Sequence, residues 1–247
     1  KCLRVCPVKA IKFKNDQANI VEERCIACGH CFIACPQNAR KVKSDLESIK
    51  EAIHEGKKVV ATVAPSYVGA FDLDKVEQMV YALKKLGFDV VEETAIGADV
   101  VASLYTQNIN YENYKNIITT ACPSSNFLIE KYLAFIIDYM LPIVSPMIAH
   151  GKMLKHAYGM DSYVIFIGPC IAKKVEANEP QHNDIIDAVM TFEELDNWFK
   201  EENIDLKNMK YAPFDNDSTG RGRRFPIEAG VLESFITDDI KNCYDVI

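Results

Sequence analysis

Six cysteines in the first 35 residues have the spacing of iron–sulfur cluster ligands. The segment RCIACGHCFIACP, residues 24–36, places Cys25, Cys28, Cys31 and Cys35 with two, two and three residues between them and ends on a proline. A [4Fe–4S] cubane takes four thiolates, and a tight C-x-x-C-x-x-C loop can supply three of them to one face. In proteins with two such clusters, the fourth cysteine of the run binds the neighbouring cluster. A second run of cysteines is therefore expected.

The N-terminal segment KCLRVCP supplies part of that second run. The predicted ligand sets are Cys6, Cys25, Cys28 and Cys31 for a complete [4Fe–4S] cluster, and Cys2 and Cys35 for an incomplete one. The chain begins where the third cysteine of the earlier run would stand, so we interpret the N-terminus as cut within a motif. A zinc knuckle is the alternative, but it would use fewer cysteines and would lack the Cys-Pro endings.

Composition limits the classes of partner. The 247 residues carry a net charge of −7, of which residues 1–43 contribute +6 and the rest −13. The thiolates of bound clusters would offset much of the positive charge, so we expect no nucleic-acid partner. No apolar run approaches the roughly 20 residues that span a bilayer, so we expect no membrane segment. Cluster-type cysteine spacing indicates a reducing, cytoplasmic compartment.

The pattern of apolar residues divides the chain into three segments. Residues 1–43 form an incomplete iron–sulfur domain, residues 44–56 predict a connecting helix from Ser44 to Gly56, and residues 57–247 alternate β-rich runs with amphipathic helices. That alternation is typical of an α/β domain with largely parallel sheets. The predicted strands are 57–63, 88–93, 116–120, 162–168 and 185–190, and the predicted helices are 74–87 (capped by Asp74 and Glu77), 97–108, 145–159 and one around Trp198.

Three short motifs each follow a predicted strand and precede a helix. They are VAPSY (63–67), TTACPS (119–124) and IGPC (167–170). In open α/β sheets, the carboxyl ends of the strands form the crevice that binds ligands. A thiolate at Cys122 or Cys170 would be stabilised by the N-terminus of the following helix. The alternative for each is a small buried side chain in the core.

Taken together, these motifs resemble the catalytic domain of iron-only (FeFe) hydrogenases. TTACPSSN, SPM, GPCIAKKVEAN and DAVMTFEEL are similar to family motifs that read roughly TSCCP and MPCxxKxxE. The resemblance covers residues 57–247, and a ferredoxin-like unit commonly precedes that domain in the family. It implies two lobes with largely parallel sheets and an H-cluster-type site, in which a cubane is bridged to a two-iron centre carrying carbon monoxide and cyanide.

The resemblance also implies an activity and residue roles. The activity is reversible reduction of protons to dihydrogen, or hydrogen sensing, in an anaerobe, with electrons exchanged with a ferredoxin or another redox partner. Sensory or regulatory domains are expected in the full-length protein. Cys122 and Cys170 would bind the cubane, and Lys173 would hydrogen-bond a cyanide, whereas Lys174 is expected to be solvated. The other residues of this pocket would be Pro65, Ser66 and Met147.

Four positions depart from the family pattern. Ala121 stands where the most active enzymes have a proton-donating cysteine, and Gly168 where a methionine packs over the two-iron site. Leu104 and Tyr105 replace a pair of proton-relay glutamates. Without relays, proton delivery to a buried metal should be slow. These changes resemble the sensory branch of the family.

The family's third cysteine motif is missing from the chain. Cys243 is expected to be a core cysteine before a terminal strand, so the chain offers two of the four cubane ligands. We therefore expect an inactive fragment of a longer, ferredoxin-type hydrogenase. Two rival functions stay open. One is a hydrogenase-like protein without the two-iron centre, serving as a sensor or cluster-assembly factor; the other is a simple ferredoxin-type electron carrier.

Two further groups of residues have no assigned role. The loop DSTGRGRRFPIEAG, residues 217–230, carries Arg221, Arg223 and Arg224, and is interpreted either as a solvated loop or as a site for an anion or an acidic partner. The histidines have no metal-ligand spacing; they are His30, His54, His150, His156 and His182.

Overall fold

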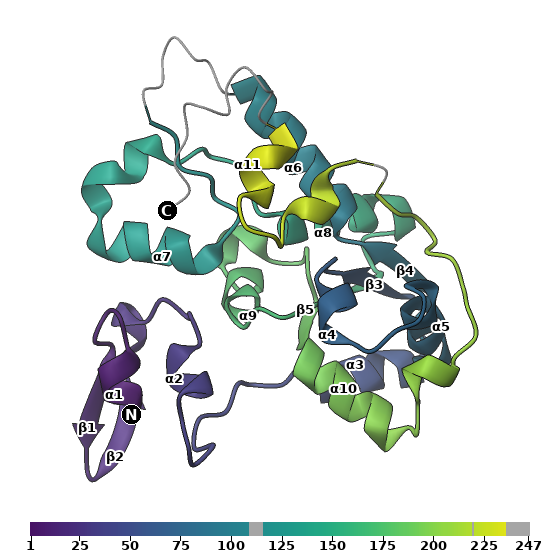
Figure 1. The fold of residues 1–247 in the computed structure, drawn as a ribbon, viewed down its shortest axis with the longest axis horizontal. Coiled ribbons are helices and arrows are strands. Elements are labelled where there is room, and N and C mark those ends of the chain that lie inside the picture. The colour runs from purple at the N-terminus through teal and green to yellow at the C-terminus, as the bar shows by residue number, and fades with distance from the viewer. Residues whose placement is uncertain (109–115, 219, 236–247) are drawn as a thin grey trace.

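A computed structural model describes residues 1–108, 116–218 and 220–235 of the protein (Figure 1). The first 35 residues form a small unit of short elements: α1 (Cys2–Val5), β1 (Ile11–Lys14), β2 (Gln17–Ile20), η1 (Glu22–Arg24) and α2 (His30–Ile33). β1 and β2 are an antiparallel hairpin in which Ile11 pairs with Ile20. Asn15 and Asp16 turn the chain with φ values of 51° and 56°, as a two-residue type I′ hairpin loop requires.

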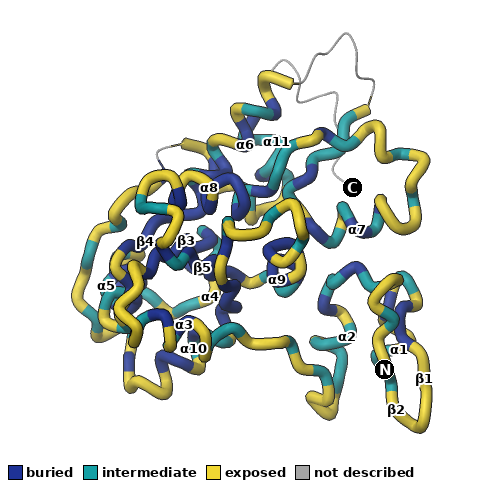
Figure 2. The backbone as a smooth tube through the Cα atoms, turned by 180° about the vertical axis from the view of Figure 1, so that it is seen from behind, coloured by how far each residue is buried: buried dark blue, intermediate teal, exposed yellow. Residues whose placement is uncertain are grey.

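The larger domain is built on a four-stranded parallel sheet with the order β4-β3-β5-β6. The strands are β3 (Val59–Val63), β4 (Val90–Glu93), β5 (Tyr163–Gly168) and β6 (Ala188–Thr191). Every residue of β3, β4 and β6 is buried, as expected for strands covered on both faces. Figure 2 shows this burial concentrated on the strands and on α8, whereas β1 and β2 are mostly exposed. The predicted α/β fold with a parallel sheet is confirmed.

Helices pack on both faces of the sheet. In Figure 1, α6 (Ala95–Asn108) and α8 (Pro146–Tyr158) lie above it, and α3 (Leu46–His54) and α10 (Phe192–Glu201) below it. The remaining helices are α4 (Tyr67–Ala70), α5 (Glu77–Leu86), α7 (Pro123–Tyr132), η2 (Ala134–Tyr139), α9 (Ala172–Ala177), η3 (Pro180–His182), η4 (Leu206–Asn208), η5 (Gly222–Arg224) and α11 (Gly230–Phe235). None of the helices in the described ranges is long and apolar enough to span a bilayer.

A second, smaller core lies beside the sheet. Its buried residues come from α6, α8, α11 and the loop before α8: Val101, Ala102, Tyr105, Leu141, Ala149 and Phe235. α6 and α8 pack closely at Gly97. A Cβ added there would lie 2.4 Å from the carbonyl oxygen of Pro146. Within the described ranges this second lobe carries no sheet of its own.

Two local predictions are wrong. The run 116–120 forms no strand of the sheet; Ile118 makes only an isolated parallel bridge with Met140. Asp74 and Glu77 do not cap α5. Instead the side chain of Gln78 accepts hydrogen bonds from the backbone N–H groups of Asp74 and Lys75, at 2.8 and 3.0 Å.

A helix is present where the connecting helix is predicted, shortened by a residue or two at each end, but its Ile49 and Ala52 are buried in the core of the larger domain. Ser44 Oγ accepts the N–H of Leu46 at 3.2 Å, and Gly56 follows the helix with a φ of 71°. Cys243 lies outside the described residues.

Candidate functional site

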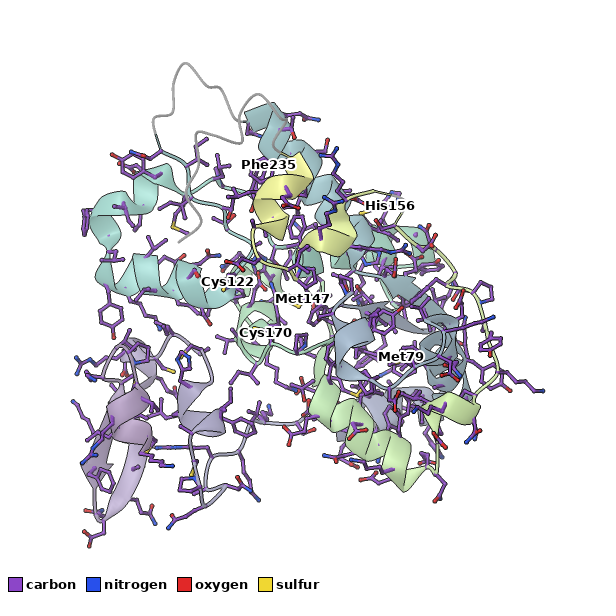
Figure 3. The ribbon with its side chains drawn as sticks, in the orientation of Figure 1. Met79, Cys122, Met147, His156, Cys170 and Phe235 are labelled. Carbon is purple, nitrogen blue, oxygen red and sulfur yellow. The ribbon has the colours of Figure 1, made fainter. Side chains whose placement is uncertain are left out.

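Two of the three motifs lie side by side at one edge of the sheet. Pro65 and Ser66 follow β3, and Gly168 ends β5; these two strands are parallel neighbours. The third motif does not follow a sheet strand, but Cys122 is the N-cap of α7. Figure 3 shows Cys122, Met147 and Cys170 in one region of the molecule. The fold therefore brings the predicted site residues together from three distant parts of the chain.

Lys173 joins two of these motifs directly. Its Nζ donates to the carbonyl oxygen of Ala121 at 3.3 Å and pairs with the carboxylate of Glu176 at 2.6 Å. Lys173 and Glu176 are both buried, with side chains 11% and 5% exposed. An ammonium group has three donors; residues that the structure describes engage two of them, which leaves one for a ligand. The residue before Cys122 and the helix after Cys170 are thus tied together by one lysine.

The expectation for Lys174 is wrong. This lysine is 8% exposed rather than solvated. Its Nζ donates to the carbonyl oxygen of Val189 and pairs with Glu194 at 3.1 Å and Asp45 at 3.6 Å. Lys174 therefore fastens the start of α3 to β6 and α10.

The residues around the sheet edge leave little free space. Met147 is 1% exposed. A Cβ added at Gly168 would lie 2.6 Å from the ring of Phe166 and 3.1 Å from Cβ of Ala64. The ring of Phe166 thus occupies the space that a larger side chain at position 168 would need.

Tyr105 contacts the backbone of Thr120, the residue before Ala121. It is fully buried, its hydroxyl oxygen accepts the N–H of Thr120 at 2.9 Å, and burial raises the pKa of its hydroxyl. The phenol therefore stays protonated near neutral pH and holds the peptide next to Ala121. Leu104, Tyr105 and Ala121 give this region no side chain that titrates near neutral pH.

The small N-terminal unit gathers four of its six cysteines around one core. Cys6 is buried with Ala10 and Ile11, and Cys2, Cys25 and Cys31 pack against them. Within the described ranges, no three His, Cys, Asp or Glu side chains are placed to hold a single metal ion. A cubane is larger than one ion, so its four thiolates stand further apart.

Backbone N–H groups point at several of the thiols. Ala10 donates to Cys6 Sγ at 3.2 Å, Ala27 to Cys25 Sγ at 3.4 Å, and Ala39 to Cys35 Sγ at 3.4 Å. Hydrogen bonds of this kind favour the thiolate over the thiol. They lower the pKa of Cys35, whereas burial raises the pKa of Cys31.

Arg40 brings the two remaining cysteines into one neighbourhood. Its guanidinium lies 4.0 Å from Cys2 Sγ, and its positive charge also helps to lower the pKa of Cys35. Cys2 and Cys35, the two predicted ligands of the incomplete cluster, therefore share one cationic neighbour.

A cleft of about 980 Å³ separates the N-terminal unit from the larger domain, and Cys28 and Cys170 both line it. Its charged lining residues are Arg40 and Lys41 from the N-terminal segment and Glu193 and Glu194 from α10. The two parts approach closely at one point, where a Cβ added at Gly29 would lie 3.0 Å from the side chain of Ile171. Residues adjacent to Cys28 and Cys170 are therefore in contact.

A second cavity, of about 380 Å³, is lined by Glu176, the partner of Lys173, and by polar residues to which the sequence analysis gives no role in the site. Three buried polar atoms that line it have no hydrogen-bond partner among the described residues: Asn126 Oδ1, Ser145 Oγ and His182 Nδ1. Burial lowers the pKa of His182 and raises the pKa of Glu179 beside it. These residues come from three separate segments. Asn126 and Ser145 stand in the motifs TTACPSSN and SPM, whereas Glu179 and His182 stand in neither.

His150, which has no role in the sequence analysis, is a hydrogen-bonded core residue. It is fully buried, with Nδ1 2.8 Å from Thr62 Oγ1 and Nε2 3.1 Å from Glu92. The hydroxyl of Tyr158 donates to the other oxygen of Glu92 at 2.5 Å. The imidazole joins β3, β4 and α8.

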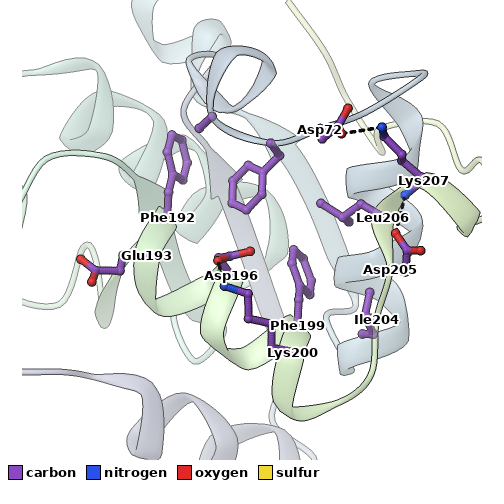
Figure 4. Close-up of a pocket in the computed structure, with 12 residues that line it drawn as sticks. Asp72, Phe192, Glu193, Asp196, Phe199, Lys200, Ile204, Asp205, Leu206 and Lys207 are labelled. Atoms are coloured by element: carbon purple, nitrogen blue, oxygen red, sulfur yellow. Dashed lines mark hydrogen bonds and ion pairs between the residues drawn. The ribbon is translucent and has the colours of Figure 1, made fainter.

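A further cavity of about 620 Å³ lies beside α10 (Figure 4). Phe71, Phe192 and Phe199 line it, and Asp72 pairs with Lys207 at its rim at 2.5 Å. It contains none of the predicted site residues.

Comparison with known proteins identifies the larger domain. The family described as "Iron only hydrogenase large subunit, C-terminal domain" matches residues 57–244. The chain belongs to this family. Residues 1–45 of this hydrogenase-like chain match a separate model, the LdpA Fe-S cluster-binding domain. Both the resemblance and the iron–sulfur interpretation of the N-terminal unit are confirmed at the level of family.

The relatives of this hydrogenase-like chain include proteins named as hydrogenases and proteins named NAR1. It is 27% identical to NADP-reducing hydrogenase subunit HndD of Solidesulfovibrio fructosivorans, covering 88% of this chain and 43% of that protein. It is 28% identical to iron hydrogenase 1 of Clostridium pasteurianum, covering 95% and 48%. It is 26% identical to protein NAR1 of Arabidopsis thaliana, covering 84% and 52%. The chain thus spans about half the length of these relatives.

The fold agrees with solved hydrogenases. A variant of [FeFe]-hydrogenase HydA1 from Chlamydomonas reinhardtii superposes with a TM-score of 0.62 at 23% identity, over 70% of this chain and 51% of that one. At 23% sequence identity, this structural similarity shows only that the two proteins share a fold.

The clusters that the family implies fit the described residues unequally. The N-terminal unit offers the four cysteines predicted for one complete cubane, and backbone N–H groups are directed at the sulfurs of two of them, Cys6 and Cys25. Cys122 and Cys170 supply two of the four thiolates that a second cubane would take. The described residues therefore fit the first cluster and half of the second.

Proposed function

We propose that this chain carries electrons within a hydrogenase-like iron–sulfur protein. A redox partner such as a ferredoxin would exchange electrons with a [4Fe–4S] cluster in the N-terminal unit. That cluster would exchange them with a site at Cys122 and Cys170. The observation that supports this proposal is the shared cleft: Cys28, a predicted ligand of the first cluster, and Cys170, a predicted ligand of the second, line the same cavity.

The reaction of the whole protein would be the reversible combination of two protons and two electrons to give dihydrogen, or the sensing of dihydrogen. A two-iron centre with its cubane would supply the redox chemistry when bound. The residues of this chain would form the protein environment of that centre. Glu176 and the Ala121 carbonyl orient the ammonium of Lys173 and leave one of its donors free for an anionic ligand. A reducing, cytoplasmic setting is proposed, in line with the cluster-spaced cysteines.

A second candidate function is a sensor or cluster-assembly factor without the two-iron centre. Two observations favour it: Ala121 and Tyr105 stand where the resemblance implies proton-transferring side chains, and NAR1 proteins are among the relatives. One of these is named a cytosolic Fe-S cluster assembly factor, at 26% identity over 78% of this chain.

Infrared spectroscopy separates the two candidates. The protein would be matured anaerobically with the hydrogenase accessory machinery and its spectrum recorded. Carbon monoxide and cyanide bands would establish a two-iron centre. If these bands are absent from protein whose N-terminal cluster is intact, the result would favour the sensor or cluster-assembly function.

Iron analysis tests whether the larger domain binds a cluster. Replacing Cys170 with Ala should lower the iron content, whereas the neighbouring Ile171→Ala control should not. A Cys170→Ala variant that keeps all the iron of the parent would make the larger domain a docking scaffold and the chain a simple electron carrier.

A further inference from the structure

α7 connects the two predicted cluster sites physically. Cys122 is its N-cap, and its last two residues, Lys131 and Tyr132, contact the N-terminal unit. Ten residues of α-helix at 1.5 Å per residue span about 15 Å. In Figure 1, α7 lies directly above the N-terminal unit, with α9 beside its start. A rigid element of known length therefore separates Cys122 from the loop that carries Cys25.

The contacts at the far end of α7 are made to the peptides that carry cluster ligands. Lys131 Nζ donates to the carbonyl oxygen of Cys25 at 2.6 Å and lies 3.4 Å from that of Glu22. The hydroxyl of Tyr132 donates to the carbonyl oxygen of Arg24 at 2.7 Å and lies 3.5 Å from that of Val8. Val8 is two residues after Cys6, so both ligand-bearing segments of the complete set are held.

The ammonium of Lys131 has an electrostatic consequence for such a cluster. Reduction adds one negative charge to the cluster, and a fixed positive charge beside the Cys25 peptide favours the reduced form. Charge near the cluster and hydrogen bonding around it are two of the factors that set its potential. Lys131 and Tyr132 are both exposed to solvent, so salt and water screen the effect and keep it small.

We propose that Lys131 and Tyr132 are positioning residues. They clamp the cluster-binding loop at one helix length from Cys122, and Lys131 also raises the reduction potential of that cluster. This inference rests on the proposed function for the [4Fe–4S] cluster at Cys6, Cys25, Cys28 and Cys31. It makes no use of a two-iron centre.

The electrostatic part is tested by redox titration. The anaerobically reconstituted chain is titrated with dithionite, and the reduced cluster is followed by electron paramagnetic resonance. Lys131→Met should lower the ratio of reduced to oxidised cluster about threefold at the parent's midpoint, or about 30 mV at 59 mV per tenfold change. Lys131→Arg should leave the midpoint unchanged, and raising the salt to 1 M should shrink the difference.

A matched control is available on the other side of the molecule. Lys85 is exposed on α5, far from the N-terminal unit in Figure 1, and Lys85→Met makes the same change of charge. Equal midpoints for Lys131→Met and Lys85→Met, in samples with equal iron and sulfide, would overturn the electrostatic part.

The clamp itself is tested by limited proteolysis, with or without iron. Residues 34–45, which join the two parts, contain no helix or strand. Cleavage there should be at least fivefold faster in the double variant Lys131→Met, Tyr132→Phe than in the parent. Equal cleavage rates would overturn the clamp. If the parent chain binds no iron, the proposed function fails, and the proteolysis comparison still decides the clamp.

Discussion

Arg223→Met tests the role of the arginine-bearing loop. Arg223 Nη2 and Nε lie 2.6 and 2.8 Å from one carboxylate oxygen of Glu93, whose side chain is only 4% exposed. The same oxygen accepts one backbone N–H, from Ser218, at 3.2 Å. Removing the guanidinium leaves a buried carboxylate with a single donor among the described residues, which costs about 3–5 kcal/mol when both partners are buried. Since the Arg223 side chain is 49% exposed, water screens the pair and we expect about 2 kcal/mol.

Urea unfolding at neutral pH measures this loss, and the same loop provides the control. Arg221 makes one hydrogen bond, to the carbonyl oxygen of Glu233 at 3.3 Å, so Arg221→Met should change the free energy of unfolding by less than about 0.5 kcal/mol. Adding Glu93→Gln to Arg223→Met should recover about half of the loss, because the unpaired charge is gone. Equal losses for the Arg221 and Arg223 variants would refute the reasoning, and so would a double variant with no recovery.

Three further substitutions test the packing around the site. Gly97→Ala should cost about 3 kcal/mol in urea unfolding, because its Cβ would lie 2.4 Å from a backbone oxygen of α8. Gly69→Ala, with open space around it, should change stability by less than about 0.5 kcal/mol. Tyr105→Phe should cost about 1–2 kcal/mol, because the buried N–H of Thr120 loses its acceptor; an unchanged midpoint would contradict this. His182→Gln should reduce the loss of stability between pH 7 and 5. Because the pKa of His182 is lowered in the folded protein, the unfolded chain binds more protons than the folded chain once the pH falls below 6.5. Stability therefore decreases as the pH is lowered, and removing the imidazole makes this decrease smaller.

The part of the site that sequence could predict is the part carried by local motifs. Cys122, Cys170 and Lys173 lie in short segments with strong local patterns, and the fold brings those segments together. Lys173 and Lys174 show the limit. The two are adjacent, yet one reaches Ala121 and the other reaches Asp45, which lies 129 residues away in the chain. Nothing in the local sequence distinguishes them, because both partners are set by tertiary packing.

The errors have the same physical origin. The run 116–120 is rich in β-branched residues, but a strand needs a neighbour, and only Ile118 finds one. The arginine loop is expected to be either solvated or a site for an anion or an acidic partner. Its three arginines are exposed, and they also contact acidic residues of the same chain or their backbone. The contacts are with Glu93, Asp217 and Glu233. Glu93 is more than 120 residues from Arg223, so sequence spacing could not reveal the pair.

The hydrogen bonds at the end of α7 have a consequence for how such proteins are assembled from parts. The acceptors on the N-terminal unit are all main-chain oxygens, of Val8, Glu22, Arg24 and Cys25. Lys131 and Tyr132 therefore recognise the path of a cysteine loop and are indifferent to its side chains. Residues 1–45 match a domain known from a different protein, LdpA. Any cysteine loop with this backbone course meets the requirement, so gene fusion can exchange the N-terminal unit while the contacting end of α7 stays the same.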